Sequence, residues 1–380
     1  MYRVYAYRLY PSLAQEKLLF STIETCRRFY NALLAERRDA WTHEQRSVTK
    51  IEQLRKVKEL KATNPYARDI HSHVLQVVVA DLDRAFQGFF RRVRAGEQPG
   101  YPRFKGKNRF LSFGFKEYGN GFKIDGRRLR LHGIGRIAVR WHRPLPCTPK
   151  TVRIVRKADG WYAMFTCDVD ATPLPPAGRD VGIDVGVASL ITTSDGEKVP
   201  NPKWYQAGQK KLRRQQRRMS RRQKGGSNWR KAVRLVACHH LHVARQRKDI
   251  LDKIVHGLVH RYDFIAVEDL QIRNMARNRY LAKSIMDAGW GYFMNRLHAK
   301  AAEAGRVVVE VDPAYTSQTC SSCGQRFPEH IDLSVRTVSC PCGLVRDRDV
   351  NAAINILRLG RSRWASTSAV AGVAQEAAGL

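Results

Sequence analysis

Acidic residues are scarce in this sequence of 380 residues, which has 34 Asp and Glu against 68 Lys and Arg and a net charge of +34 at pH 7. A folded protein with this imbalance repels itself unless a polyanion neutralises its surface. A disordered basic tail is excluded, because 43% of the residues are hydrophobic and 9% are aromatic. Nucleic acid is therefore the leading partner, and an acidic membrane surface is the alternative.

Long apolar runs are also missing. No stretch approaches the roughly 20 apolar residues that cross a membrane, and the first eight residues lack the apolar core of a signal peptide. Cysteine is rare: four of the eight cysteines stand singly, and the other four lie between residues 320 and 342. This distribution favours a reducing cytoplasm and one metal site over a secreted disulfide framework.

The first half of the chain combines helices with short strands. Residues 2–10 alternate as in a strand, and Ser12 with Gln15 forms the capping box of a helix. A second helix is expected over 71–94. Short alternating runs with close turns over 95–175 predict a small β-barrel or sandwich. We expect strand 2–10 to join it, so that residues 11–94 form a helical insertion.

From residue 178 strands and helices alternate, which is the signature of an α/β domain. The final Ala/Gly/Ser-rich residues, 361–380, are expected to form a flexible tail. The expected strands are 179–185, 188–193, 262–268 and 306–311, and the expected helices are 204–223, 228–260, 286–304 and one that begins at 351.

Three acids stand at positions suited to chemistry. Asp184 and Glu268 each end an apolar strand, and Asp349 begins the last helix. Open α/β sheets place their sites at the carboxyl ends of parallel strands. Three carboxylates there suit Mg²⁺ or Mn²⁺ rather than zinc, and two such ions about 4 Å apart hydrolyse phosphodiesters. Taken singly, each acid could instead end a strand or cap a helix, Asp349 in particular.

The clustered cysteines have metal-ligand spacing. A C-x₂-C pair and a C-x-C pair, separated by sixteen residues, fit a four-thiolate zinc ribbon with a structural Zn²⁺; the ligands are Cys320, Cys323, Cys340 and Cys342. His330 as a substitute ligand and a redox disulfide are the alternatives.

Residues 210–224 carry nine Lys and Arg and no acid. Like charges four residues apart destabilise an isolated helix by a few tenths of a kcal/mol per pair, whereas a phosphate backbone reverses that sign. A solvated face is the alternative, but such faces normally include acids. We therefore predict that one helical face contacts nucleic acid, through Arg213, Arg214, Arg217, Arg218, Arg221 and Arg222. Residues 225–228 are expected to turn the chain into the next helix, so that the two helices form a hairpin.

The three acidic motifs, together with the cysteine module, resemble the TnpB family. TnpB proteins are transposon-encoded RNA-guided DNA nucleases related to the type V CRISPR effectors. The resemblance covers nearly the whole chain, and its motifs are 7–12, 102–107, 182–187, 266–270, 287–291 and 347–356.

The resemblance implies an α/β fold plus a β-barrel: a RuvC/RNase H-like nuclease domain with a zinc-ribbon insertion, preceded by a wedge-type β-barrel that carries a helical recognition insertion. The implied ranges are 1–10 and 95–175 for the wedge, 11–94 for the recognition insertion, 178–312 and 346–360 for the nuclease domain, 313–345 for the target nucleic-acid-binding zinc ribbon, and 361–380 for the tail.

The implied activity is RNA-guided cleavage of DNA next to a short transposon-associated motif, by two Mg²⁺ or Mn²⁺ ions on Asp184, Glu268 and Asp349. The family pattern selects Asp349 because it precedes x-Asn-Ala-Ala, and Asp347 is the nearby alternative. The implied partners are a guide RNA from the transposon end, double-stranded target DNA and the RNA–DNA heteroduplex. The expected form is a monomer on one RNA in a prokaryotic cytoplasm, nucleoid-associated on DNA.

Two rival classes use the same features. A non-catalytic RNA- or DNA-binding regulator needs the basic surfaces and the zinc ribbon but not the acids. A transposase that performs strand transfer also uses carboxylates and metal ions. The acids favour catalysis over binding alone, and the family resemblance favours a nuclease over a transposase.

Overall fold

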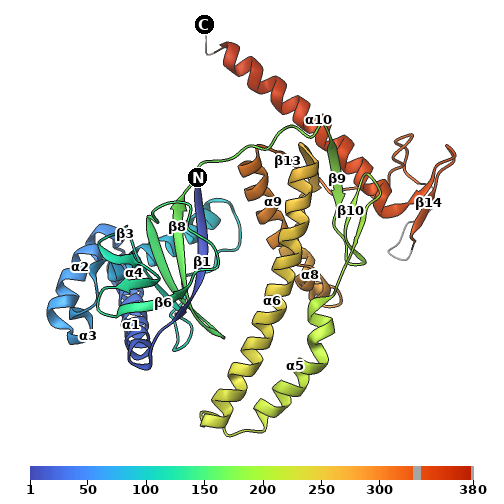
Figure 1. The fold of residues 1–380 in the computed structure, drawn as a ribbon. Helices are drawn as coiled ribbons and strands as arrows, with labels where there is room; N and C mark the ends of the chain where they lie inside the picture. The colour runs from blue at the N-terminus through green and yellow to red at the C-terminus, as the bar shows by residue number, and fades with distance from the viewer. Residues whose placement is uncertain (328–334, 378–380) are drawn as a thin grey trace. The chain divides into compact units, whose positions relative to one another are not determined.

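The computed structural model describes residues 1–327 and 335–377, with side chains described up to residue 367. The chain divides into two compact units, Met1–Asp170 (unit 1) and Ala171–Leu380 (unit 2) (Figure 1). Each unit has its own hydrophobic core. Within the described residues, the helices are all too short or too polar to cross a membrane.

Unit 1 contains one eight-stranded sheet, ordered β2-β7-β8-β1-β6-β5-β4-β3, with four helices. The strands are β1 (Tyr2–Tyr10), β2 (Ser112–Phe115), β3 (Glu117–Tyr118), β4 (Gly121–Asp125), β5 (Arg128–Leu131), β6 (Gly135–Arg140), β7 (Thr151–Lys157) and β8 (Gly160–Asp168). The helices are α1 (Leu13–Glu44), α2 (Lys50–Thr63), α3 (Pro65–Arg68) and α4 (Ser72–Arg94).

The first strand joins this sheet as predicted, between β8 and β6. Its alternate residues Tyr5, Tyr7 and Leu9 are buried in the core, and α1 follows through the predicted capping box of Ser12 and Gln15. The predicted closed barrel is not seen: among the described residues no pairing joins the edge strands β2 and β3. The alternation of buried and exposed residues is the same in an open sheet as in a closed one, and β3 has only two residues to offer a partner.

Unit 2 contains a mixed five-stranded sheet, ordered β11-β10-β9-β12-β13, and a two-stranded sheet of β14 and β15. Strands β9, β12 and β13 are parallel, and β10 runs antiparallel to both of its neighbours, β9 and β11. The strands are β9 (Asp180–Asp184), β10 (Ser189–Thr193), β11 (Lys198–Pro200), β12 (Phe264–Glu268), β13 (Val307–Val311), β14 (Thr337–Ser339) and β15 (Val345–Asp347). The helices are α5 (Trp204–Ser220), α6 (Ser227–Arg261), α7 (Ile272–Met275), α8 (Ala282–Ala288), α9 (Trp290–Ala304) and α10 (Arg348–Ala377).

The two faces of the five-stranded sheet are covered by different helices. Ile183, Ile265 and Val267 belong to the core cluster that includes α6 and α9. Phe264 and Ala266 instead pack with Ile356 of α10. Because side chains alternate along a strand, every second residue of β9 and β12 faces α10.

Glycine allows α10 to lie directly on the strands. A Cβ atom at Gly182 of β9 would collide with the backbone carbonyl of Ala353 and the amide of Leu357. A Cβ at Gly360 would come within 2.5 Å of the Ala266 Cβ atom. This close approach fixes where the first turn of α10 lies relative to the ends of β9 and β12.

Some helix boundaries differ from those predicted. The helix expected over 286–304 is two helices, α8 and α9, because Gly289 adopts a left-handed φ of 74°. Helix α5 ends at Ser220, so Arg221 and Arg222 lie just beyond it. Helix α10 continues across residue 361, where a flexible tail was predicted, since Ala-rich sequence has high helix propensity.

Candidate metal centres and basic hairpin

Two of the predicted acids lie side by side at the edge of the five-stranded sheet. Asp184 is the last residue of β9 and Glu268 is the last residue of β12. These strands are parallel neighbours in which Ile183 is level with Val267, so the two acids are also level. Both are on the α10 side, because the alternate residues Ile183 and Val267 belong to the opposite core.

The two candidates for the third acid make different contacts. Asp347 caps α10: its Oδ1 accepts the backbone N–H groups of Asp349 at 3.1 Å and Val350 at 3.2 Å. Its other oxygen accepts from Lys198 Nζ at 2.6 Å. Asp349 lies in the first turn of α10, where its carboxylate has an ion pair of 3.4 Å with Arg348. The capping role that the sequence left open for Asp349 therefore belongs to Asp347.

Asp184 is buried within reach of the charges of the other acids. Burial raises the pKa of Asp184 to about 8, together with the negative charges of Glu268, Asp349 and Asp347 and against the positive charge of Arg348. Burial also raises the pKa of Glu268, although the Thr316 hydroxyl opposes this shift. Bringing three carboxylates together in a poorly solvated place is unfavourable without a cation.

The donor set fits a hard divalent cation. Carboxylate oxygens from three elements are the ligands that Mg²⁺ and Mn²⁺ prefer. Among the described residues, the four-cysteine group alone has ligand atoms that all lie within 4.8 Å of one another. In the described part of the chain, the three carboxylates do not form such a compact group.

The four predicted cysteines form that compact group. The Sγ atoms of Cys320 and Cys342 lie 3.7 Å apart, and those of Cys323 and Cys340 lie 3.6 Å apart. A disulfide needs about 2.05 Å, and all four thiols are free, so this group contains no disulfide in the structure. Four converging sulfurs fit a closed structural zinc site. The alternative ligand His330 lies outside the described residues.

Two asparagines of α10 attach this helix to the segment that leads into the cysteines. The Nδ2 atoms of Asn351 and Asn355 both donate to the carbonyl of Thr319, at 2.8 and 2.7 Å. Asn355 also donates to the carbonyl of Thr316 at 2.9 Å. Sequence reasoning did not assign these residues a role. The available signal was two amide side chains four residues apart in the first turns of an otherwise apolar stretch, 350–357.

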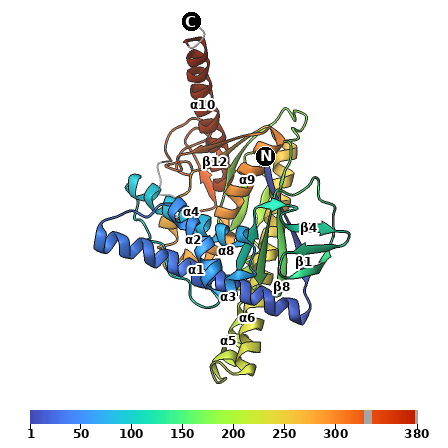
Figure 2. The ribbon, with the colours of Figure 1, turned by 90° about the vertical axis from the view of Figure 1, so that its left-hand side faces the viewer.

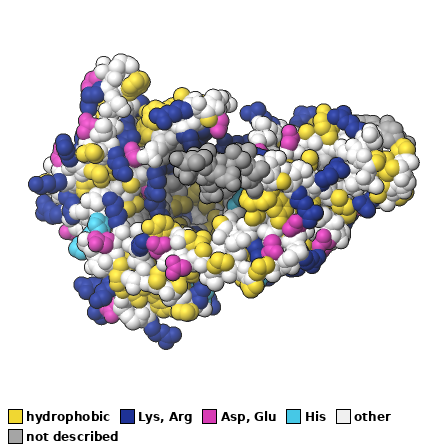
Figure 3. Space-filling model, turned by 90° about the horizontal axis from the view of Figure 1, so that it is seen from above, with side chains coloured by type: hydrophobic (Ala, Val, Ile, Leu, Met, Phe, Trp, Pro, Cys, Tyr) yellow, Lys and Arg dark blue, Asp and Glu magenta, His cyan; other side chains and the backbone are white. Residues whose placement is uncertain are grey.

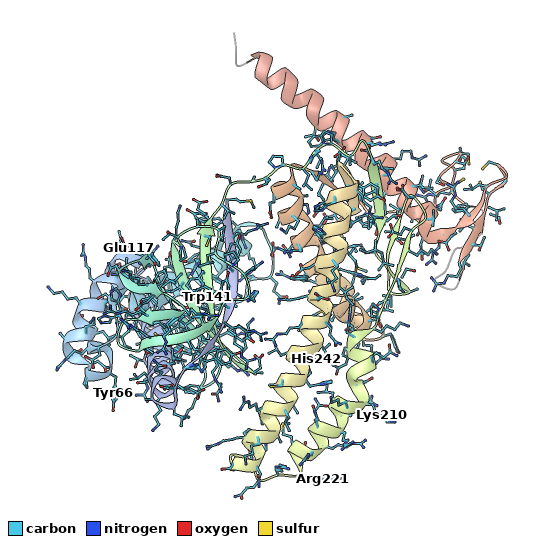
Figure 4. All side chains as sticks on the ribbon, viewed as in Figure 1. Tyr66, Glu117, Trp141, Lys210, Arg221 and His242 are labelled. Atoms are coloured by element: carbon cyan, nitrogen blue, oxygen red, sulfur yellow. The ribbon has the colours of Figure 1, made fainter. Side chains whose placement is uncertain are left out.

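The predicted basic hairpin is present as α5 and α6, which lie side by side in Figures 1 and 2. Five of the six predicted arginines are exposed, and Arg222 donates to the carbonyl of Asn228 at 2.9 Å. A groove of about 1520 Å³ lies along α5 and reaches Ala232 and Leu235 of α6. Figure 4 labels Lys210 on α5 and Arg221 beyond its end.

The hairpin is free of acidic residues over a long stretch. Residues 198–248 contain 17 Lys and Arg and no Asp or Glu. Lys and Arg side chains also outnumber acids on the face of the molecule drawn in Figure 3. A region with so many cations and no internal counter-charge is suited to a polyanion.

Asp287 holds the base of this hairpin. Its carboxylate accepts the backbone N–H of Tyr205, in the first turn of α5, at 2.9 Å, and the Arg247 guanidinium of α6 at 2.6 Å. Among the described residues, Lys203 at the start of α5 makes no side-chain cap, so Asp287 supplies one from a distant element. The sequence pointed to Asp287 only as part of a family-like motif.

The fold and site together define an α/β protein with a carboxylate cluster at one sheet edge, a separate four-cysteine module and a large basic surface. Three family models match parts of the chain. They are described as "Probable transposase" (OrfB_IS605) over residues 164–279, "Cas12f1-like, TNB domain" over 290–356 and "Helix-turn-helix domain" of OrfB_IS605 over 1–46. In the structure, residues 1–46 contain strand β1 and the single long helix α1.

Full-length relatives agree with these matches. A Streptomyces pristinaespiralis protein named "Putative RNA-guided DNA endonuclease" is 36% identical over 366 residues, covering 94% of this chain and 89% of that one. An Escherichia coli K12 protein, "Putative RNA-guided DNA endonuclease InsQ", is 33% identical over 78% of this chain and 76% of its own length. The chain belongs to the OrfB, or TnpB, family of nucleases, which confirms the resemblance of its motifs.

A solved structure shows only a distant likeness. "Structure of the mini-RNA-guided endonuclease CRISPR-Cas_phi3" is 10% identical, with a TM-score of 0.47, over 95% of this chain and 92% of that one. A likeness at this level decides nothing about the site.

Proposed function

We propose that the protein is an RNA-guided DNA endonuclease that cleaves target DNA next to a short transposon-associated motif, in a RuvC-like site. The observation that carries the proposal is the meeting of Asp184, Glu268 and Asp349 on one side of the sheet, where burial and mutual repulsion raise the pKa of Asp184 to about 8. RNA guidance follows from the names of the full-length relatives.

The three acids are the proposed ligands of two Mg²⁺ or Mn²⁺ ions. When bound, such ions activate a water molecule and stabilise the leaving oxygen of a phosphodiester. The protein's own part is positioning. Asp347 caps the helix that carries Asp349, and the closely packed Gly182 holds that helix against β9. The four cysteines are proposed to bind one structural Zn²⁺.

The remaining surfaces are proposed to bind nucleic acid. The six arginines from Arg213 to Arg222 supply backbone contacts to the guide RNA, the target DNA or their heteroduplex. Unit 1 is proposed to combine the wedge with its helical recognition insertion at 11–94, and the cysteine module, 313–345, to contact the target. One protein chain on one RNA, nucleoid-associated in the cytoplasm when on DNA, is the proposed form.

The test uses the protein purified with its co-expressed RNA, which is extracted and sequenced to design the target. Asp184→Asn and Glu268→Gln are expected to abolish cleavage while RNA and DNA binding persist. Asp180→Asn is the matched control, because Asp180 lies at the other end of β9 and pairs with Arg361 on the surface. Retained cleavage in Asp184→Asn, or the absence of a defined bound RNA, would overturn the proposal.

Strand transfer is a second candidate, favoured by the description of the model that matches residues 164–279. A transposase joins a DNA end to the target, whereas a nuclease leaves unjoined ends. Sequencing the products of a reaction that contains labelled transposon ends therefore separates the two. Binding without cleavage by the unmodified protein would favour the regulator class.

A further inference from the structure

Thr316 connects the cysteine module to the carboxylate centre. Its hydroxyl donates a hydrogen bond to Glu268 Oε1 over 2.6 Å, and both residues are buried, with exposed fractions of 4% and 8%. The carbonyl of Pro313 is a second possible acceptor at 3.2 Å, but a hydroxyl has one proton. The much shorter distance assigns that proton to Glu268.

The position of Thr316 is fixed by α10 on one side and by the cysteines on the other. Asn355, which is 1% exposed, donates to the carbonyls of Thr316 and Thr319. Asn351 donates to Thr319 and accepts the backbone N–H of Ser321 at 2.8 Å. Residues 316–321 are here named the strap. At one end of the strap Thr316 contacts Glu268, and near the other end lies the first zinc-ligand candidate, Cys320.

The cysteine module also contacts the start of α10. The backbone N–H of Arg348 donates to the carbonyl of Arg336 at 2.8 Å, and β15 pairs with β14 up to and including Asp347. Two of the three acids, Glu268 and Asp349, are therefore linked to this module, one through the strap and the other through β15.

We propose that the cysteine module is a positioning element of the nuclease centre as well as a proposed nucleic-acid contact. The strap holds the Thr316 hydroxyl against Glu268, and that hydrogen bond fixes the carboxylate in its metal-binding orientation. Thr316 acts through Glu268, so it is a positioning residue. The inference rests on the proposed function, in which Glu268 binds a divalent cation.

Hydrogen-bonding partners of metal ligands commonly contribute 10- to 100-fold to metal affinity or activity. Replacing Thr316 by Val keeps the branched shape and removes the hydroxyl, which leaves a buried carboxylate oxygen without this donor. We expect Thr316→Val to weaken Mn²⁺ binding and to slow cleavage, each by about 10-fold. Thr316→Ser retains the hydroxyl and is expected to restore most of both.

The experiment measures Mn²⁺ affinity by electron paramagnetic resonance on the protein with its bound RNA, and cleavage as a function of Mg²⁺ concentration. Thr337→Val is the matched control, because Thr337 lies in the same module on β14 with an exposed side chain. It is expected to leave both quantities unchanged. Zinc content by elemental analysis is expected to stay the same in all three threonine variants.

A double-mutant cycle tests the strap itself. Cys323→Ser is expected to lower zinc content and to weaken Mn²⁺ binding, and adding Thr316→Val to it is expected to cost little more, because the two changes break one connection. Full additivity would overturn the inference. So would unchanged Mn²⁺ affinity and cleavage in Thr316→Val while Glu268→Gln abolishes cleavage. Cleavage retained by Glu268→Gln would instead overturn the proposed function, and this inference with it.

Discussion

The carboxylate centre and the basic hairpin both concentrate charge of one sign in unit 2, but they do so in opposite ways. The three acids come from three elements, are largely buried and have raised pKa values at Asp184 and Glu268. The arginines come from one short stretch of chain and most are exposed. The comparison indicates that the carboxylate centre forms only when the fold brings distant residues together, whereas the charge of the hairpin is already concentrated along the sequence.

Breaking the packing beneath the centre is expected to have the largest effect. Gly182→Ala places a Cβ atom against the backbone of α10 at Ala353 and Leu357, and backbone cannot move aside as a side chain can. We expect a loss of about 3 kcal/mol in unfolding free energy and loss of cleavage, measured by urea denaturation and a nuclease assay.

Gly257→Ala is the control for this glycine. Gly257 lies inside α6, and the nearest atom to an added Cβ is a flexible arginine nitrogen 4.0 Å away. This change should stabilise the helix by up to about 1 kcal/mol. Equal stabilities for the two alanine variants would show that α10 does not pack on β9 as closely as described.

Asp287→Asn tests the junction between the two regions. The substitution removes the charge that faces Arg247, which has a side-chain exposure of 22% against 7% for Asp287. We expect a loss of roughly 2–3 kcal/mol in unfolding free energy and weaker nucleic-acid binding, because the base of the hairpin loosens. Thermal melting and gel shifts measure the two effects.

The corresponding surface pair is the control for that experiment. Asp249 pairs with Lys253, and both side chains are more than half exposed, so Asp249→Asn should change stability by no more than about 0.5 kcal/mol. If Asp287→Asn lowered the unfolding free energy no more than Asp249→Asn does, the role given to Asp287 would be contradicted.

Replacing arginines of the hairpin is expected to weaken nucleic-acid binding in small steps, one for each lost charge. Replacing Arg213, Arg217 and Arg221 by Gln is expected to make the slope of log affinity against log salt shallower by about 2–3, roughly 0.7–0.9 per lost phosphate contact. Replacing the same three by Lys keeps the charges and should keep the slope. An unchanged slope in the Gln variant, with its helix intact by circular dichroism, would remove this face from the binding surface.

The sequence predicted the parts of the site that depend on local order. Asp184 and Glu268 were identified because each ends an apolar strand, and the cysteines because of their spacing. The family pattern selected Asp349 over Asp347, but the capping role of Asp347 could not be predicted, since a cap is recognised by which backbone N–H groups it accepts. Thr316 and Asp287 were not assigned roles because their partners, Glu268 and Tyr205, are distant along the chain.

The larger differences in the fold have similar causes. Alternation predicted the strands of unit 1, but closure of a barrel depends on whether the two edge strands pair, and the alternation of buried and exposed residues is the same in open and closed sheets. The composition after residue 361 was interpreted as a loose tail. Its alanines also favour helix, and α10 continues through it to Ala377.

The most direct test of the account compares the two neighbouring acids at the start of α10. Asp349→Asn and Asp347→Asn are measured side by side for cleavage at saturating Mg²⁺, with binding of RNA and DNA measured in parallel. Asn retains capping ability, so Asp347→Asn should lose mainly its pair with Lys198, at a cost of about 1 kcal/mol or less, and should still cleave. Asp349→Asn should bind normally and cleave roughly 10³- to 10⁴-fold more slowly. Full cleavage by Asp349→Asn, with loss of cleavage in Asp347→Asn, would contradict the centre described here.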